Sequence, residues 1–177
     1  MRKYLILFLI LPTVIFAVPN NTRTPHSVEL RGGISNSDGK SNPMGSFLYQ
    51  YFMNDNWAIG FAVQPIIVSR EVRGGSITDN AANRTIMLIP IDFTAGYFFN
   101  MDSALQPFIR GYIGPAIVQG AGSAEQIFHL GLGAGLRYFV TDEIFLSAEL
   151  SGNAFALQEK TRPQNGPFFQ VGAGISF

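Results

Sequence analysis

Apolar and polar residues alternate along most of the chain with a period of two, the pattern of a strand that has one face in apolar surroundings. Eight such runs, bounded by turn residues, occupy the chain from residue 27 onward. They are Ser27–Asn36, Met44–Met53, Trp57–Glu71, Arg84–Phe99, Leu105–Gly120, Glu125–Val140, Ile144–Leu157 and Pro167–Phe177. No amphipathic helical segment stands out. The pattern predicts an all-β protein of eight strands.

The links between the runs alternate in length. The links after the second and sixth runs are the short "NDN" and "TDE", whereas those after the first, third and seventh are the longer "SDGKSNP", "VRGGSITDNAAN" and "QEKTRPQNG". In an up-and-down barrel successive links lie at opposite rims, so one rim has short turns and the other has loops. We therefore expect residues 27–177 to form an eight-stranded antiparallel up-and-down transmembrane β-barrel.

The stretch "HLGLGAGLRYFV" indicates which face meets lipid. Leu130, Leu132 and Leu136 share one face, and His129 and Arg137 share the other with three glycines. The uniformly apolar face suits acyl chains, and the mixed face suits a crowded, partly polar lumen. A soluble lipocalin-like barrel, the competing fold, would have the reverse arrangement. An open sheet edge is not viable in hydrocarbon, so the sheet must close, with the last strand pairing with the first.

Aromatic residues gather at the short-turn ends of the predicted strands. Alternation directs six of them toward lipid, where they would form an interfacial girdle. These six are Tyr51, Trp57, Tyr97, Phe99, Tyr138 and Phe177. A general preference of aromatics for strands does not explain their clustering at one rim.

The first 17 residues, "MRKYLILFLILPTVIFA", have two basic residues, an apolar stretch and a small residue at Ala17. This order predicts a secretory signal peptide over residues 1–17, followed by a short lead-in over residues 18–26. A membrane-anchoring helix is the alternative. It is disfavoured because the apolar stretch is shorter than the ~20 residues that a spanning helix needs and contains Pro12.

Composition narrows the classes of function. Charged residues make up 14% of the chain, and the formal net charge is zero. Nothing therefore favours a nucleic-acid partner. The absence of cysteine excludes thiolate chemistry, disulfides and Cys-ligated metal. We expect no cofactor, no metal ligands and no catalytic residues.

Six charged residues are expected to point into the lumen: Glu29, Arg31, Asp92, Arg110, Arg137 and Glu149. Counting from the turns brings Arg110, Arg137 and Glu149 together across Gly135. These residues form either a salt-bridge plug or a gated polar path. We favour the plug, because separating a buried ion pair is costly.

Seven apolar residues are expected to point into the outer half of the lumen: Ile66, Val68, Ile86, Leu88, Val118, Ile127 and Phe155. They are either ordinary core packing, which we favour, or the lining of a small apolar pocket. Four prolines, Pro65, Pro90, Pro107 and Pro115, fall inside predicted strands, and each removes a ladder donor. We expect some of them to mark bulges or strand ends.

One weak catalytic constellation is present. His129 lies near Ser151 and Asn153 of the neighbouring predicted strand, with Glu149 deeper in the lumen. A lipid hydrolase or acyltransferase needs a base, a hydroxyl and an orienting acid in reach of one another. A recognisable His/Ser lipase signature is absent, and the pair His26–Ser27 lies at the rim away from the outer leaflet. We expect no enzyme.

With "GLGAGLRYFVTDEIFLSAEL", the chain resembles the small OmpA-like eight-stranded outer-membrane barrels. Four residues near the end, Gln170, Gly172, Ile175 and Phe177, resemble the C-terminal signal that the barrel-assembly machinery reads in that family. The resemblance implies a monomer in the bacterial outer membrane, exported through its signal peptide, with membrane lipids and lipopolysaccharide as partners.

The resemblance leaves three functions open. The first is a structural or surface-display role, with contact surfaces around Lys40, Arg73–Asn83 and Lys160–Arg162 and a largely plugged lumen. The second is binding or transport of a small hydrophobic molecule through the barrel. The third, which we favour least, is lipid-modifying catalysis.

Overall fold

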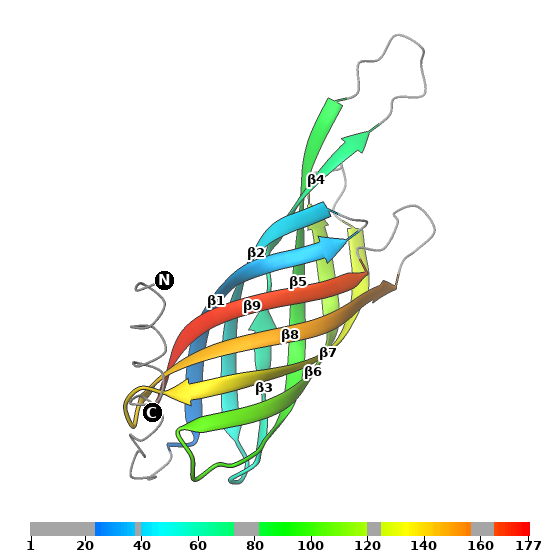
Figure 1. Cartoon of the computed structure of the whole chain (residues 1–177). Helices are drawn as coiled ribbons and strands as arrows, with labels where there is room; N and C mark the ends of the chain where they lie inside the picture. The colour runs from blue at the N-terminus through cyan, green and yellow to red at the C-terminus, as the bar shows by residue number, and fades with distance from the viewer. Residues whose placement is uncertain (1–23, 38–39, 73–81, 120–124, 157–164) are drawn as a thin grey trace, which may run out of the picture.

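The computed structural model describes residues 24–37, 40–72, 82–119, 125–156 and 165–177. They form one antiparallel sheet that is rolled into a barrel (Figure 1). Its strands are β1 (His26–Ser37), β2 (Lys40–Phe52), β3 (Trp57–Val63), β4 (Ile66–Val72), β5 (Ala82–Phe98), β6 (Leu105–Gln119), β7 (Glu125–Phe139), β8 (Ile144–Ala156) and β9 (Gly166–Ser176). Among these residues no helix is long and apolar enough to cross a membrane. The signal peptide predicted for residues 1–17 lies outside the described part.

The barrel is closed because β1 pairs with both β2 and β9. The nine strand segments make eight positions around it, since β3 and β4 follow one another along the same position between β2 and β5. The prediction of an eight-stranded antiparallel barrel is therefore confirmed.

The third predicted strand, Trp57–Glu71, is interrupted at Gln64–Pro65. Neither Pro65 nor Pro90, which lies on β5, has a backbone N–H to donate. The Gln64 N–H donates to the carbonyl of Pro90 at 3.0 Å. The register continues unchanged across the gap, from Phe47 opposite Val63 to Met44 opposite Ile66. The alternation of inward and outward side chains therefore continues across the gap.

The prolines were expected to mark bulges or strand ends, and Pro65 does lie at a strand end, between β3 and β4. No bulge is found at Pro107 or Pro115. The β6–β7 register is constant from Leu105 opposite Tyr138 to Val118 opposite Glu125, across Pro107 and Pro115. Prolines lose a donor but keep an acceptor, and the carbonyls of Pro65 and Pro107 accept backbone N–H groups at 3.0 and 2.8 Å. The ladder tolerates them without an extra residue.

The first link is also shorter than predicted. β1 runs to Ser37 and β2 begins at Lys40, and these two residues face each other across the hairpin. Lys40 is therefore exposed at a strand end rather than placed within a long loop. "SDGKSNP" reads as a loop because Ser and Asn favour turns, but Asn42 is buried in a lumen that accommodates polar side chains. Asn83 likewise lies in β5, opposite Glu71, whereas residues 73–81 and 157–164 lie outside the described part.

Side-chain exposure confirms which face is apolar. The side chains of Leu132 and Leu30 are 70% and 66% exposed, whereas Arg110 is 1% exposed. Four of the six predicted girdle residues are exposed at the short-turn rim: Tyr51, Trp57, Phe99 and Phe177. The other two, Tyr97 and Tyr138, are half-buried on the same outer face, and the Tyr97 ring packs edge-on against Trp57 and Phe99.

Two glycines allow neighbouring strands to approach closely. A Cβ at Gly114 would lie 2.0 Å from the carbonyl oxygen of Ile91, and one at Gly60 would lie 1.9 Å from that of Tyr49. No other residue fits these positions without moving backbone. The sequence therefore sets the curvature of the barrel wall through glycine as well as through alternation.

Candidate functional site: the filled lumen

Aromatic side chains close the short-turn end of the lumen. Phe98, Phe108 and Met101 form a buried cluster with Ala58, and Phe52 packs against it. Phe139 and Phe145, also buried, pack with tilted rings whose centroids lie 5.4 Å apart. These rings alternate with the girdle residues along the strands, so the same rim carries one aromatic layer toward lipid and a second toward the axis.

An ionic cluster lies above this aromatic floor, centred on Glu149. Its Oε2 lies 2.7 Å from Arg31 Nη1 and 2.6 Å from Arg110 Nη1. The Tyr112 hydroxyl donates to Glu149 Oε1 at 2.5 Å. One carboxylate on β8 thus joins side chains from β1 and β6 across the full width of the lumen.

Glu29 carries the other acidic charge of the cluster. It accepts a hydrogen bond from Ser147 and lies 3.6 Å from Arg31 Nε and 3.7 Å from Arg137 Nη2. Gln50 Oε1 connects two of the arginines, because it accepts hydrogen bonds from Arg137 Nη2 at 2.8 Å and from Arg110 Nη2 at 3.2 Å. Every member of this network is buried.

The cluster contains three arginines and two glutamates, so it has one more positive than negative side chain. Aromatic rings contact the guanidinium groups and stabilise this extra positive charge. The guanidinium carbon of Arg137 lies 4.0 Å from the centroid of Phe145, and that of Arg110 lies 4.4 Å from the centroid of Phe108. Cation–π contacts of this kind are worth up to ~2 kcal/mol when desolvated. The aromatic floor and the ionic cluster therefore stabilise each other.

The predicted meeting point of the charges differs in detail. Gly135 lies opposite Glu149, as the turn count gives, but Arg110 lies opposite Gly133. A Cβ at Gly133 would lie 2.5 Å from Glu149 Oε1, so this glycine leaves the space in which the ion pair forms. Arg137 Nη2 lies 3.7 Å from Glu29 Oε2, a contact that the turn count did not give. The error arises because register along one hairpin does not specify contacts across the lumen.

Asp92, the sixth predicted charge, belongs to a separate polar cluster. Its Oδ1 lies 2.8 Å from His129 Nδ1, and its Oδ2 accepts from Gln64 Nε2 at 2.9 Å. His129 Nε2 lies 3.0 Å from Asn153 Oδ1, and Asn153 donates to the Ser151 hydroxyl at 2.9 Å. Both ring nitrogens of His129 are thus engaged, and Ser151 contacts Asn153 rather than the histidine.

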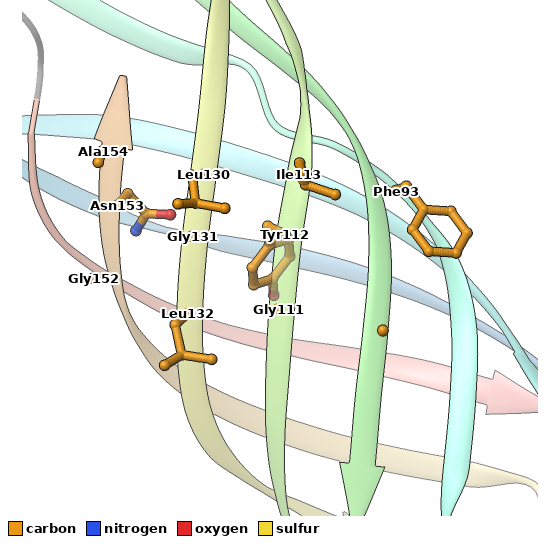
Figure 2. Close-up of a pocket in the computed structure, with 11 residues that line it drawn as sticks. Phe93, Gly111, Tyr112, Ile113, Leu130, Gly131, Leu132, Gly152, Asn153 and Ala154 are labelled. Atoms are coloured by element: carbon orange, nitrogen blue, oxygen red, sulfur yellow. The ribbon is translucent and has the colours of Figure 1, made fainter. Parts of the chain in front are cut away.

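Apolar side chains fill the loop-end part of the lumen. Six of the seven residues predicted there are buried in one cluster, and Ile127 packs against it. The cluster also contains Met44, Ala116 and Phe168. These contacts support the packing interpretation. The hollow shown in Figure 2 lies elsewhere, on the outer wall.

The four residues of the C-terminal motif divide between the two faces. Gln170 is buried in the lumen and donates to Gln64 Oε1 at 3.1 Å, and Gly172 leaves room for the stem of Arg31. Ile175 and Phe177 are exposed on the outer face. Phe177 is held by backbone hydrogen bonds to His26 of 2.9 and 3.2 Å, and its ring stacks on the His26 ring.

Sequence reasoning missed several uncharged members of the lumen. Gln50, Gln64 and Tyr112 are all buried there and all bind a charged side chain. Their signal was present, since alternation on β6 places Tyr112 on the same face as Arg110. Among the described residues, no group of three or more His, Cys, Asp or Glu side chains is placed to hold a metal ion.

Comparison with known proteins agrees with this geometry. Residues 8–177 match the family model described as "Outer membrane protein beta-barrel domain". The chain is similar to OprG of Pseudomonas aeruginosa (15% identity, TM-score 0.60, covering 88% of this chain and 97% of that one). It is also similar to the Neisserial surface protein NspA (18%, 0.55, 85% and 94%) and to the N-terminal barrel domain of Pseudomonas aeruginosa OprF (18%, 0.53, 85% and 97%). No curated protein sequence matches. A closed barrel with an apolar outer face and an ionic lumen, matched over nearly all its length by that family model, belongs to the outer-membrane β-barrel proteins.

Proposed function

We propose that this barrel is a membrane-spanning scaffold with a closed lumen that displays the segments joining its strands at the loop end. The observation that carries the proposal is the succession of buried side-chain layers inside the barrel. An aromatic floor, an Arg–Glu cluster, the His129–Asp92 cluster and an apolar layer follow one another from the short-turn end to the loop end. Eight strands leave an interior just wide enough for such side chains.

The closed lumen predicts no ion conduction. In planar bilayers the purified barrel is expected to give no stepwise current. The variant Asp102→Asn, which changes an exposed turn residue, controls for the effects of purification and reconstitution. Regular conductance steps from the wild-type barrel would refute the plug and favour the polar path.

Display is tested separately from conduction. The chain has no cysteine, so Ser76→Cys and Ser103→Cys each introduce a single thiol. Ser76 lies in the link between β4 and β5, and Ser103 in the turn between β5 and β6. A membrane-impermeant maleimide is expected to label Ser76→Cys on intact cells and Ser103→Cys only after the outer membrane is permeabilised. The reverse labelling would exclude display by the longer links.

Carriage of a small hydrophobic molecule is the second candidate, because the loop-end layer of the lumen is apolar. A ligand there would have to displace Phe155 or Phe168, both of which are buried within that layer. Incubation with a fatty acid or detergent, followed by structure determination, tests this. Chain-shaped density between these rings would favour carriage over a filled lumen.

We infer no catalytic role. A serine nucleophile needs a neighbouring base with a free nitrogen, and both nitrogens of His129 face oxygen atoms of Asp92 and Asn153. The partners that we propose are membrane lipids, lipopolysaccharide and the barrel-assembly machinery, the last through Gln170, Gly172, Ile175 and Phe177. The protein is proposed to act as a monomer.

A further inference from the structure

The outer wall of the barrel contains a hollow of about 660 Å³ that spans β5, β6, β7 and β8. Figure 2 shows Leu130 and Leu132 on β7, with Gly152 and Ala154 of β8 on one side and Ile113 of β6 on the other. Most of its lining residues point outward, and the buried Tyr112 and Asn153 contribute to its floor. The hollow therefore opens toward the membrane and not into the lumen.

Small residues create the hollow. The strand register aligns Ala95, Gly111, Leu132 and Gly152 in one row across the four strands. Three of these four positions have no side chain beyond a Cβ. The adjacent row contains the bulky Phe93, Ile113 and Leu130, which stand beside the hollow as a rim, and ends at Ala154 on β8. The barrel wall is therefore recessed along the row of small residues, because the large side chains of the adjacent row project beyond it.

The occupant of this hollow has to be apolar. The outward residues around it are hydrocarbon side chains or glycine, and it continues directly into the exposed apolar band that faces lipid. An unfilled recess would lose dispersion contacts on its lining atoms. Eleven residues line it, whereas a stable protein interface uses roughly 20–30 residues a side. One acyl chain suits this size better than a second copy of the barrel.

The hollow runs from near the loop rim on β7 and β8 toward the short-turn girdle on β5. On β8 it reaches Ala154, two residues before the strand ends at the loop rim, and on β7 it reaches Leu130, opposite Ala154. On β5 it descends to Ala95, two residues from the girdle residue Tyr97. Its loop end lies on the side that faces the outer leaflet in barrels of this architecture, so a lipid of that leaflet can place a chain in it.

We propose that this hollow is a specific seat for one acyl chain of lipid A, the lipid portion of lipopolysaccharide. The seat holds the chain by shape, because the small residues admit it and Phe93, Ile113 and the β7 leucines flank it. The proposal requires the barrel to span the outer membrane but does not depend on whether the lumen is closed.

Two glycines allow the seat to be filled without disturbing the wall. A Cβ at Gly152 meets no atom within 4 Å, and one at Gly111 meets only the Ala95 carbonyl oxygen at 3.9 Å. Gly111→Leu and Gly152→Leu therefore place bulk in the hollow. Gly32→Leu is the matched control, since Gly32 is an exposed glycine on β1, also has no atom within 4 Å, and lies outside the hollow.

The experiment reconstitutes each barrel in phosphatidylethanolamine nanodiscs that contain deep-rough lipopolysaccharide, then releases it for native mass spectrometry. The wild-type barrel and Gly32→Leu are expected to retain one lipopolysaccharide molecule. Gly111→Leu and Gly152→Leu are expected to lose it while keeping the gel shift of a folded barrel between unheated and boiled samples.

Three results would overturn the proposal. The proposed acyl-chain site would be refuted if the filled variants retained as much lipopolysaccharide as the wild-type barrel, or if the wild-type barrel retained none. Retention of phosphatidylethanolamine in place of lipopolysaccharide would refute the lipid A assignment. A wild-type dimer that Gly152→Leu converts to a monomer would assign the hollow to a second copy of the chain.

Discussion

Arg110 and Glu149 form an ion pair of 2.6 Å although the strand β7 lies between their own strands, β6 and β8. The contact is possible because β7 presents Gly133 opposite Arg110, and a side chain there would occupy the space of the carboxylate. The pair therefore depends on a residue that contributes no side chain. Its stability can be tested at each of the three positions.

Removal of the arginine is expected to destabilise the barrel without opening it. Arg110→Ala leaves Glu149 paired with Arg31 alone and should lower the free energy of unfolding by about 3–5 kcal/mol. Urea unfolding in detergent measures the change, and planar bilayers should still show no large channel because the aromatic floor remains. An unchanged unfolding midpoint would refute the hypothesis that Arg110 belongs to a stabilising salt-bridge plug.

Removal of the carboxylate is expected to cost more. Glu149 is the shared acceptor of Arg31, Arg110 and Tyr112, so Glu149→Ala leaves two buried guanidinium groups without their main partner. Its unfolding midpoint should fall below that of Arg110→Ala. The double variant should be less destabilised than the sum of the two single variants, because residues in one network are coupled. If the destabilisations of the two single variants simply added in the double variant, Arg110 and Glu149 would not stabilise each other.

The glycine between them gives a third test. Gly133→Ala places a Cβ 2.5 Å from Glu149 Oε1 and 2.9 Å from Ser151 Cβ. Overpacking of this kind typically costs about 1–3 kcal/mol. Gly152→Ala on the adjacent strand meets no atom within 4 Å and is expected to leave the unfolding midpoint nearly unchanged. Equal midpoints for the two variants would show that Glu149 relaxes freely.

The terminal aromatic is expected to act during assembly more than in the folded barrel. The Phe177 ring is 54% exposed on the outer face, and its backbone bonds to His26 survive truncation of the side chain. Phe177→Ala should slow insertion by purified assembly machinery while leaving the unfolding midpoint close to that of the wild-type barrel. Phe169→Ala, a similarly exposed residue of the same strand at 48%, is the control. Equal insertion rates for the two variants would contradict a signal at Phe177.

The sequence predicted the wall of the barrel well because alternation is a local property. Leu132 faces outward and Arg137 inward whatever the partners of their strand are, so the period of two alone assigns them. The same pattern placed Arg110 and Glu149 in the lumen. Local pattern also misled at "SDGKSNP", where turn-forming residues continue the strands because a polar lumen accepts Asn42.

Contacts across the barrel were beyond the reach of the sequence. Which arginine meets which glutamate depends on the stagger of all eight positions around the barrel, and each turn count fixes only one hairpin. Gly135 was therefore placed opposite Glu149 correctly, whereas Arg110 was placed near Gly135 and lies opposite Gly133. The recess at Gly111 and Gly152 was hidden for the same reason, since it forms only when the register aligns them in one row.

Truncation of the buried histidine separates a structural role from a catalytic one. His129→Ala removes the partner that lies 2.8 Å from Asp92 and leaves that carboxylate with Gln64 alone. A buried acceptor that loses a partner costs about 1–3 kcal/mol, so the unfolding midpoint should fall. The addition of Asp92→Asn should restore part of the loss, because the neutral amide no longer needs that partner. Mass spectra of lipid A from cells with His129→Ala should match those from wild-type cells. A changed lipid A pattern would instead assign His129 to chemistry.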